Sequence, residues 1–129
     1  MIPLGRILRW FLFLVALHTF GVGVVLIAAG DTIMSYFGFP HLESRFFQMQ
    51  GGVFHLLIQY VYYKASTDLN RYEYLILFSV VIKMTATVFL FSYYFFIEQI
   101  LMILLSGIAD AGMGLIILLL YWKWKSAKH

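Results

Sequence analysis

The chain contains no cysteine, only two prolines and few charged side chains, and these shortages remove several classes of protein. Without cysteine there is no disulfide, no thiolate metal site and no cysteine nucleophile. Charged residues make up 12% of the 129 residues, and hydrophobic residues make up 63%. So little polar surface cannot coat a water-soluble globule of this size, so the lipid bilayer must be the solvent.

The apolar residues gather in four stretches, each near the length of about 20 residues that a membrane-spanning helix requires. The expected spans cover residues 7–30, 46–63, 72–96 and 99–122. In lipid every backbone N–H and C=O needs an internal partner, so all four spans are predicted to be α-helical. The predicted fold is an all-α integral membrane protein, a single domain over residues 1–129 that forms an antiparallel bundle of four transmembrane helices.

Lysine and arginine are concentrated on one side of this predicted bundle. Seven of the nine lie before or at the start of the first span, between the second and the third, or after the fourth. The positive-inside rule therefore places both termini in the cytoplasm of a cell membrane, and the short loops suit a bacterial inner membrane. Tyrosines at 60–63, 72–74 and 93–94 are expected to anchor the bilayer interfaces. The basic residues flank apolar spans and form no stripe, which argues against nucleic acid as a partner.

The connection between the first two spans has a character of its own. Asp31 and Thr32 are expected to cap a short helical turn, which Gly38 and Pro40 end. This segment is predicted to lie along the outer interface, either as a simple connector or as a lid over an outward opening. The connection around residues 97–98 is very short, which makes the third and fourth spans antiparallel neighbours.

Each span carries one ionisable residue near its midpoint. A charge at the centre of a bilayer costs at least about 2.5 kcal/mol and is rarely kept without a partner or a task. On the second span, polar and small residues recur at steps of four, three and four, which is one stripe of a helix and must face protein or water. The predicted cluster for ligand binding or ion pairing consists of His18, Gln48, His55, Gln59, Lys83 and Asp110.

Lys83 and Asp110 are expected to form an intramembrane ion pair, because they lie at similar depth on neighbouring helices. The pair could fix helix register, or it could serve as a ligand counter-ion or proton relay. At the outer mouth of the second span, Arg45 is predicted to pair with Glu43 or Glu98 or to contact an anionic group.

His18 and His55 lie near one depth on consecutive antiparallel spans. Two opposed imidazoles are what bis-histidine ligation of haem b requires, so haem is an alternative to hydrogen-bonded neutral histidines. Together with Asp110 they also form a conceivable metal site. The expectation is no cofactor, no metal and no catalytic residue, since no nucleophile elbow, phosphate loop or paired carboxylates occur.

A resemblance rests on the short-looped spans, the interfacial turn ending in a proline, and Arg45 followed by Gly51 and Gly52. These features are similar to the small four-helix bacterial membrane proteins around the DoxX-like families. Some members are accessory subunits of membrane oxidoreductases, so the resemblance implies an accessory or small-ligand role. Where that group often has an acidic residue near the glycines, this chain has Gln48 and Gln50, and no family site is carried over.

Three functions follow as hypotheses. The first is a small accessory or binding subunit, whose partners are the bilayer, other membrane subunits and a small-molecule ligand. The second is a proton relay or small-solute transporter that uses the midspan cluster. The third is a redox protein that binds haem or quinone.

Overall fold

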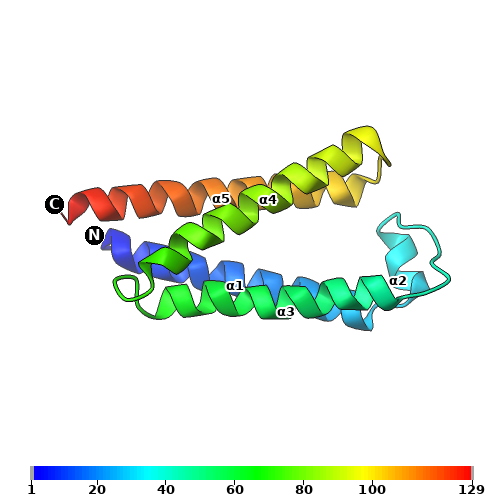
Figure 1. Ribbon diagram of the computed structural model, residues 1–129, viewed down its shortest axis with the longest axis horizontal. Coiled ribbons are helices and arrows are strands. Elements are labelled where there is room, and N and C mark those ends of the chain that lie inside the picture. The colour runs from blue at the N-terminus through cyan, green and yellow to red at the C-terminus, as the bar shows by residue number, and fades with distance from the viewer. Residues whose placement is uncertain (1, 129) are drawn as a thin grey trace.

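The computed structural model describes residues 2–128, which fold into helices and connections with no strand among them. The elements are α1 (Leu4–Ala28), α2 (Asp31–Tyr36), α3 (Phe46–Thr67), α4 (Glu73–Phe96) and α5 (Leu101–Ala127). The all-α prediction is confirmed, and each predicted span coincides with one long helix whose ends differ by a few residues (Figure 1).

Three of the long helices, α1, α4 and α5, are long and apolar enough to cross a membrane. Helix α3 has 22 residues and, at a rise of 1.5 Å per residue, a length of about 33 Å, which is also enough to cross. It is less apolar than the other three because it carries glutamines at positions 48, 50 and 59 and a histidine at 55. The chain is therefore a multi-pass helical membrane protein with three candidate spans.

The long helices are arranged as two antiparallel pairs, with α1 packed along α3 and α4 along α5. Glycines permit the close approach within each pair. A Cβ atom on Gly52 of α3 would lie 2.7 Å from the carbonyl oxygen of Gly23 on α1. A Cβ atom on Gly107 of α5 would lie 2.8 Å from the ring of Phe91 on α4. Small residues at such crossings let helix backbones pack closely in lipid.

The two pairs meet at one end of the molecule and diverge toward the other (Figure 1). The end where they meet holds both chain ends and the α3–α4 connection, and we call it the basic end. Its seven lysines and arginines are Arg6, Arg9, Lys64, Arg71, Lys123, Lys125 and Lys128. Just inside this end Leu8, Leu12, Ile76 and Ile117 are fully buried and join the two pairs in one core.

The opposite end, which we call the α2 end, carries α2 and the loop that follows it. The short helix predicted here is present, and Gly38 with a φ of 90° follows it in the left-handed conformation that glycine favours. The predicted capping is wrong: Asp31 is the first helical residue, and no side chain caps α2. The carboxylate of Asp31 instead lies 2.8 Å from Nδ1 of His41, which ties the start of the helix to the loop.

Candidate functional site

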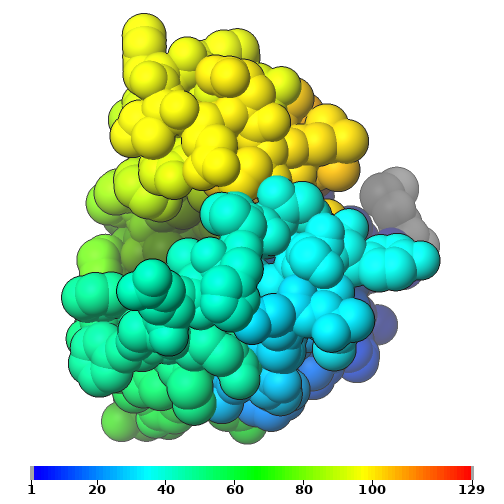
Figure 2. Space-filling view, turned by 90° about the vertical axis from the view of Figure 1, so that its right-hand side faces the viewer, coloured from blue at the N-terminus to red at the C-terminus, as the bar shows by residue number. Residues whose placement is uncertain are grey.

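The divergence of the two helix pairs leaves a central cavity of about 790 Å³ in the half of the molecule nearer the α2 end. All four long helices line it, and most of the lining residues are apolar. On α1 the lining residues His18, Val22 and Leu26 follow steps of four, so one face of that helix is turned to the cavity. Figure 2 looks at the α2 end and shows a hollow between the α4–α5 turn, in yellow, and the start of α3, in green. The volume falls within the range typical of small-molecule sites.

The wall of the central cavity contains an ion pair between α4 and α5. Nζ of Lys83 lies 2.8 Å from Oδ1 of Asp110, and the two side chains are only 6% and 16% exposed. The predicted ion pair of Lys83 and Asp110 is therefore confirmed, and it is buried between two candidate membrane spans. Each charge neutralises the other, which limits the cost of holding both away from water.

Tyr62 of α3 lies on the other side of the lysine. Nζ of Lys83 is 5.2 Å from the centre of the Tyr62 ring, a cation–π contact, and Tyr62 is only 1% exposed. The tyrosines at 60–63 were expected to anchor the interface, and for Tyr62 this is wrong. Its position, seven residues after His55 and so on the same stripe of α3, is the signal that identifies it as a cavity residue.

The two midspan histidines also line the central cavity. Nδ1 of His55 lies 2.7 Å from the carbonyl oxygen of Gly51. A carbonyl can only accept a hydrogen bond, so Nδ1 carries the proton and Nε2 is the nitrogen left for a ligand. Within residues 2–128 the imidazole of His18 forms no hydrogen bond or ion pair, and the residue is exposed. Both imidazoles come from the same packed helix pair, whereas bis-histidine haem ligation needs imidazoles on opposite sides of the macrocycle, so the arrangement does not favour haem.

Gln48 lines the cavity near the α2 end, where it has a structural task. Its Nε2 donates hydrogen bonds to the carbonyl oxygens of Leu26, at 2.8 Å, and Ala29, at 3.0 Å. The last carbonyls of a helix lack partners within the helix, so this side chain satisfies the end of α1.

Arg45 performs the same task. Its Nη2 donates to the carbonyl oxygens of Ile27, at 3.2 Å, and Ala29. Among the described residues Arg45 forms no ion pair with Glu43 or Glu98. Its guanidinium is hydrogen-bonded to the backbone at the end of α1 instead. Its contact with an external anion stays a prediction.

Five of the six residues of the predicted cluster thus surround one cavity, and the sixth, Gln59, is not among the lining residues. The connection between α1 and α3 contributes Met34, Phe39, Pro40 and Leu42 to the lining, and whether it acts as a lid stays a prediction. No group of three or more His, Asp and Glu side chains in residues 2–128 is arranged to hold a metal ion, which leaves the His18, His55 and Asp110 site without support.

The fold and the cavity define a class, a helical multi-pass membrane protein with an internal cavity that has an ion pair in its wall. No family model, no curated protein and no solved structure matches this chain. The resemblance to DoxX-like proteins therefore stays a prediction, and the function has to be argued from the cavity itself.

Proposed function

We propose that this chain is a small membrane binding protein of the accessory type, which holds a mainly apolar small molecule in the central cavity. The observation that carries the proposal is that the four midspan ionisable residues, His18, His55, Lys83 and Asp110, all line this one cavity. Intramembrane ionisable residues mark functional sites in membrane proteins, and ligand sites are apolar cavities with a few placed polar groups.

The chemistry of the lining defines the ligand. Apolar walls favour an apolar body, and the mutual neutralisation of Lys83 and Asp110 favours an uncharged one. With Nδ1 donating to Gly51, Nε2 of a neutral His55 is an acceptor that a ligand hydroxyl group can bond. We therefore infer a ligand that carries hydroxyl or carbonyl groups, a class to which quinones and quinols belong.

The topology that suits this function has four spans. We infer that α3 also crosses the membrane, because it is as long as a span and packs along α1. The seven basic side chains at one end support cytoplasmic termini, and a bacterial inner membrane remains the location that we propose.

A proton relay or transporter needs a polar path between both sides of the membrane. The core of the basic half, with Leu8, Leu12, Ile76 and Ile117 fully buried, lies between the ion pair and the basic end. Because this apolar core interrupts a polar path from the cavity to the basic end, the arrangement favours binding over transport.

The test is a change that fills the cavity. Ala86 lines the cavity, and Val88, two residues along α4, is 67% exposed on the outer surface. We expect protein purified in mild detergent to bind decylubiquinone, followed by quenching of intrinsic tryptophan fluorescence. Ala86→Trp should abolish that binding, and Val88→Trp should retain it. Small molecules that copurify, identified by native mass spectrometry, should be lost in the same variant. Equal binding to both variants would contradict the proposal.

A further inference from the structure

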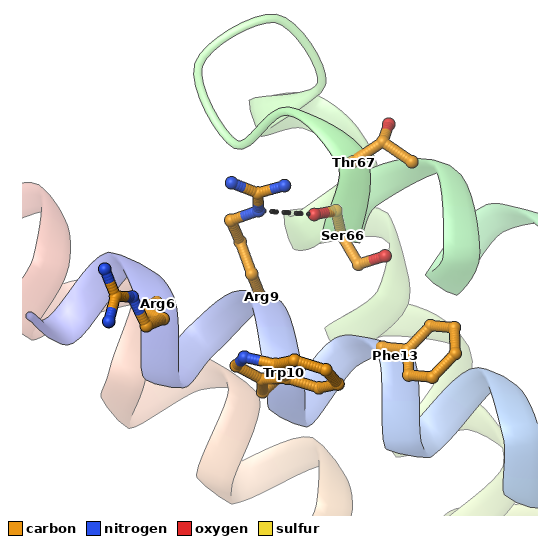
Figure 3. Close-up of a pocket in the computed structure, with 6 residues that line it drawn as sticks. All are labelled: Arg6, Arg9, Trp10, Phe13, Ser66 and Thr67. Carbon is orange, nitrogen blue, oxygen red and sulfur yellow. Dashed lines mark hydrogen bonds between the residues drawn. The ribbon is translucent and has the colours of Figure 1, made fainter. Parts of the chain in front are cut away.

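A second hollow lies at the basic end, between the start of α1 and the last turn of α3 (Figure 3). Its volume is about 370 Å³, and it shares no residue with the central cavity. We call it the basic-end hollow, and its lining consists of Arg6, Arg9, Trp10, Phe13, Ser66 and Thr67. Two cations, two aromatic rings and two hydroxyl groups thus meet at the end of a membrane-spanning helix.

The four residues from α1 are spaced at i, i+3, i+4 and i+7, which places them on one face of the helix. At a rise of 1.5 Å per residue, Phe13 lies about 10 Å further into the membrane than Arg6. The order from the end inward is therefore cation first and aromatic ring second. A phospholipid has the same order, with its phosphate at the interface and its chains below.

Arg9 is held in place by the backbone of α3. Its Nε donates a hydrogen bond of 2.9 Å to the carbonyl oxygen of Ser66. Figure 3 shows this bond and the two terminal nitrogens of the guanidinium, which make no hydrogen bond with the other residues drawn. A guanidinium that keeps two donors in a fixed fork matches the oxygen atoms of a phosphate.

The carboxylates near this end are engaged elsewhere. Oδ1 of Asp68 accepts the backbone N–H groups of Asn70 and Arg71. Oε1 of Glu73 accepts hydrogen bonds from Lys125, at 2.5 Å, and Tyr121, at 2.6 Å. No ion pair within residues 2–128 involves either arginine of the hollow. Among residues 2–128, the lining of the hollow therefore contains two cations and no carboxylate.

We propose that the basic-end hollow binds the phosphate of a membrane phospholipid, with Arg6 and Arg9 on the phosphate and the start of an acyl chain against Trp10 and Phe13. The aromatic wall favours a lipid over free phosphate, since the latter has no apolar part to place there. The two rings pack edge to face, with centres 6.0 Å apart, and form a continuous apolar surface below the cations.

The experiment is native mass spectrometry of the full chain in mild detergent, titrated with phosphatidylglycerol. We expect one tightly held lipid per chain. The double variant Arg6→Gln with Arg9→Gln should weaken binding about tenfold or more, the scale expected for two cations next to an anionic lipid. Arg6→Gln alone leaves the bond between Arg9 and Ser66 intact, so it should weaken binding without lowering the melting temperature.

The matched control is Arg71→Gln with Lys123→Gln, which removes two exposed charges from the same end but none from the hollow. Phosphatidylglycerol binding that is unchanged in this control supports a defined site. An equal loss in the control overturns the proposal, because the attraction is then diffuse. Equal binding of diacylglycerol, which lacks the phosphate, also overturns it. Displacement of the lipid by inorganic phosphate alone overturns the choice of a lipid over free phosphate.

Discussion

The two halves of this small protein use the same four helices in different ways. In the basic half, apolar side chains from both helix pairs interlock, and Leu12, Ile76 and Ile117 are fully buried. In the α2 half, the close contacts at Gly23, Gly52 and Gly107 join helices within a pair, and the space between the pairs is the central cavity. Where side chains of the two pairs pack against each other, the molecule is closed. Where each helix packs only within its own pair, the space between the pairs stays open.

The ion pair and Tyr62 lie at the boundary between these halves. Tyr62 belongs to the buried core of the basic half and also lines the cavity. Lys83 contacts Tyr62 and Asp110 at the same time, so it links α3 to the α4–α5 pair where the pairs begin to diverge. A structural and a binding role of the cluster are therefore compatible.

The largest effect is expected from breaking the ion pair at this boundary. Asp110→Asn leaves the charge of Lys83 buried without a partner, which should lower the free energy of unfolding by about 3–5 kcal/mol. Adding Lys83→Met should restore most of that loss. Unfolding by sodium dodecyl sulfate in mixed micelles measures both values. Asp31→Asn, at the half-exposed rim, is the control and should have a small effect. Additive losses in the double variant would show that the two residues act independently.

A somewhat smaller effect is expected from separating α1 from α3. Gly52→Leu places a side chain against the Gly23 carbonyl and Ile27, and overpacking of this kind typically costs about 1–3 kcal/mol. A Cβ atom on the neighbouring Gly51 would meet no other atom within 4 Å, so Gly51→Leu is the matched control and should be tolerated. The same unfolding assay applies. Similar losses in both variants would mean that the crossing is not as close as described.

The contrast between a packed and an open half can be tested directly with two truncations. Leu12→Ala removes fully buried atoms from the basic half, while Leu105→Ala removes half-exposed atoms from the cavity wall. In lipid the loss is mainly one of packing contacts, so we expect about 1–2 kcal/mol for the first and little for the second. Equal effects would remove the distinction between the halves.

The smallest effect is expected at the end of α1. Gln48→Ala removes the side chain that bonds the carbonyls of Leu26 and Ala29, which should cost about 1 kcal/mol. Gln50 is exposed on the same helix, and Gln50→Ala should change nothing measurable. Hydrogen exchange at the α2 end should rise only in the first variant. A rise in both variants would indicate that the α2 end frays for another reason.

The sequence predicts the helices from their apolar length. It predicts the ion pair from two charges at similar depth on helices that a short connection makes neighbours. It predicts less about the other contacts between helices. Gln59 shares the stripe of His55, yet it does not line the cavity. It lies seven residues after Gly52 and so on the face of α3 that packs against α1. Arg45 contacts backbone carbonyls, which no pattern of side chains reveals.

The most direct test of the account is cysteine accessibility, since the chain has no cysteine of its own. Single variants Ser106→Cys in the cavity wall, Ile117→Cys in the packed core and Leu119→Cys on the outer surface should be treated with a charged, membrane-impermeant thiosulfonate reagent. We expect modification at position 106 alone, and only from the α2 side of oriented vesicles. Modification at position 117 as fast as at 106, or no reaction at 106, would contradict a water-accessible cavity closed at the basic end.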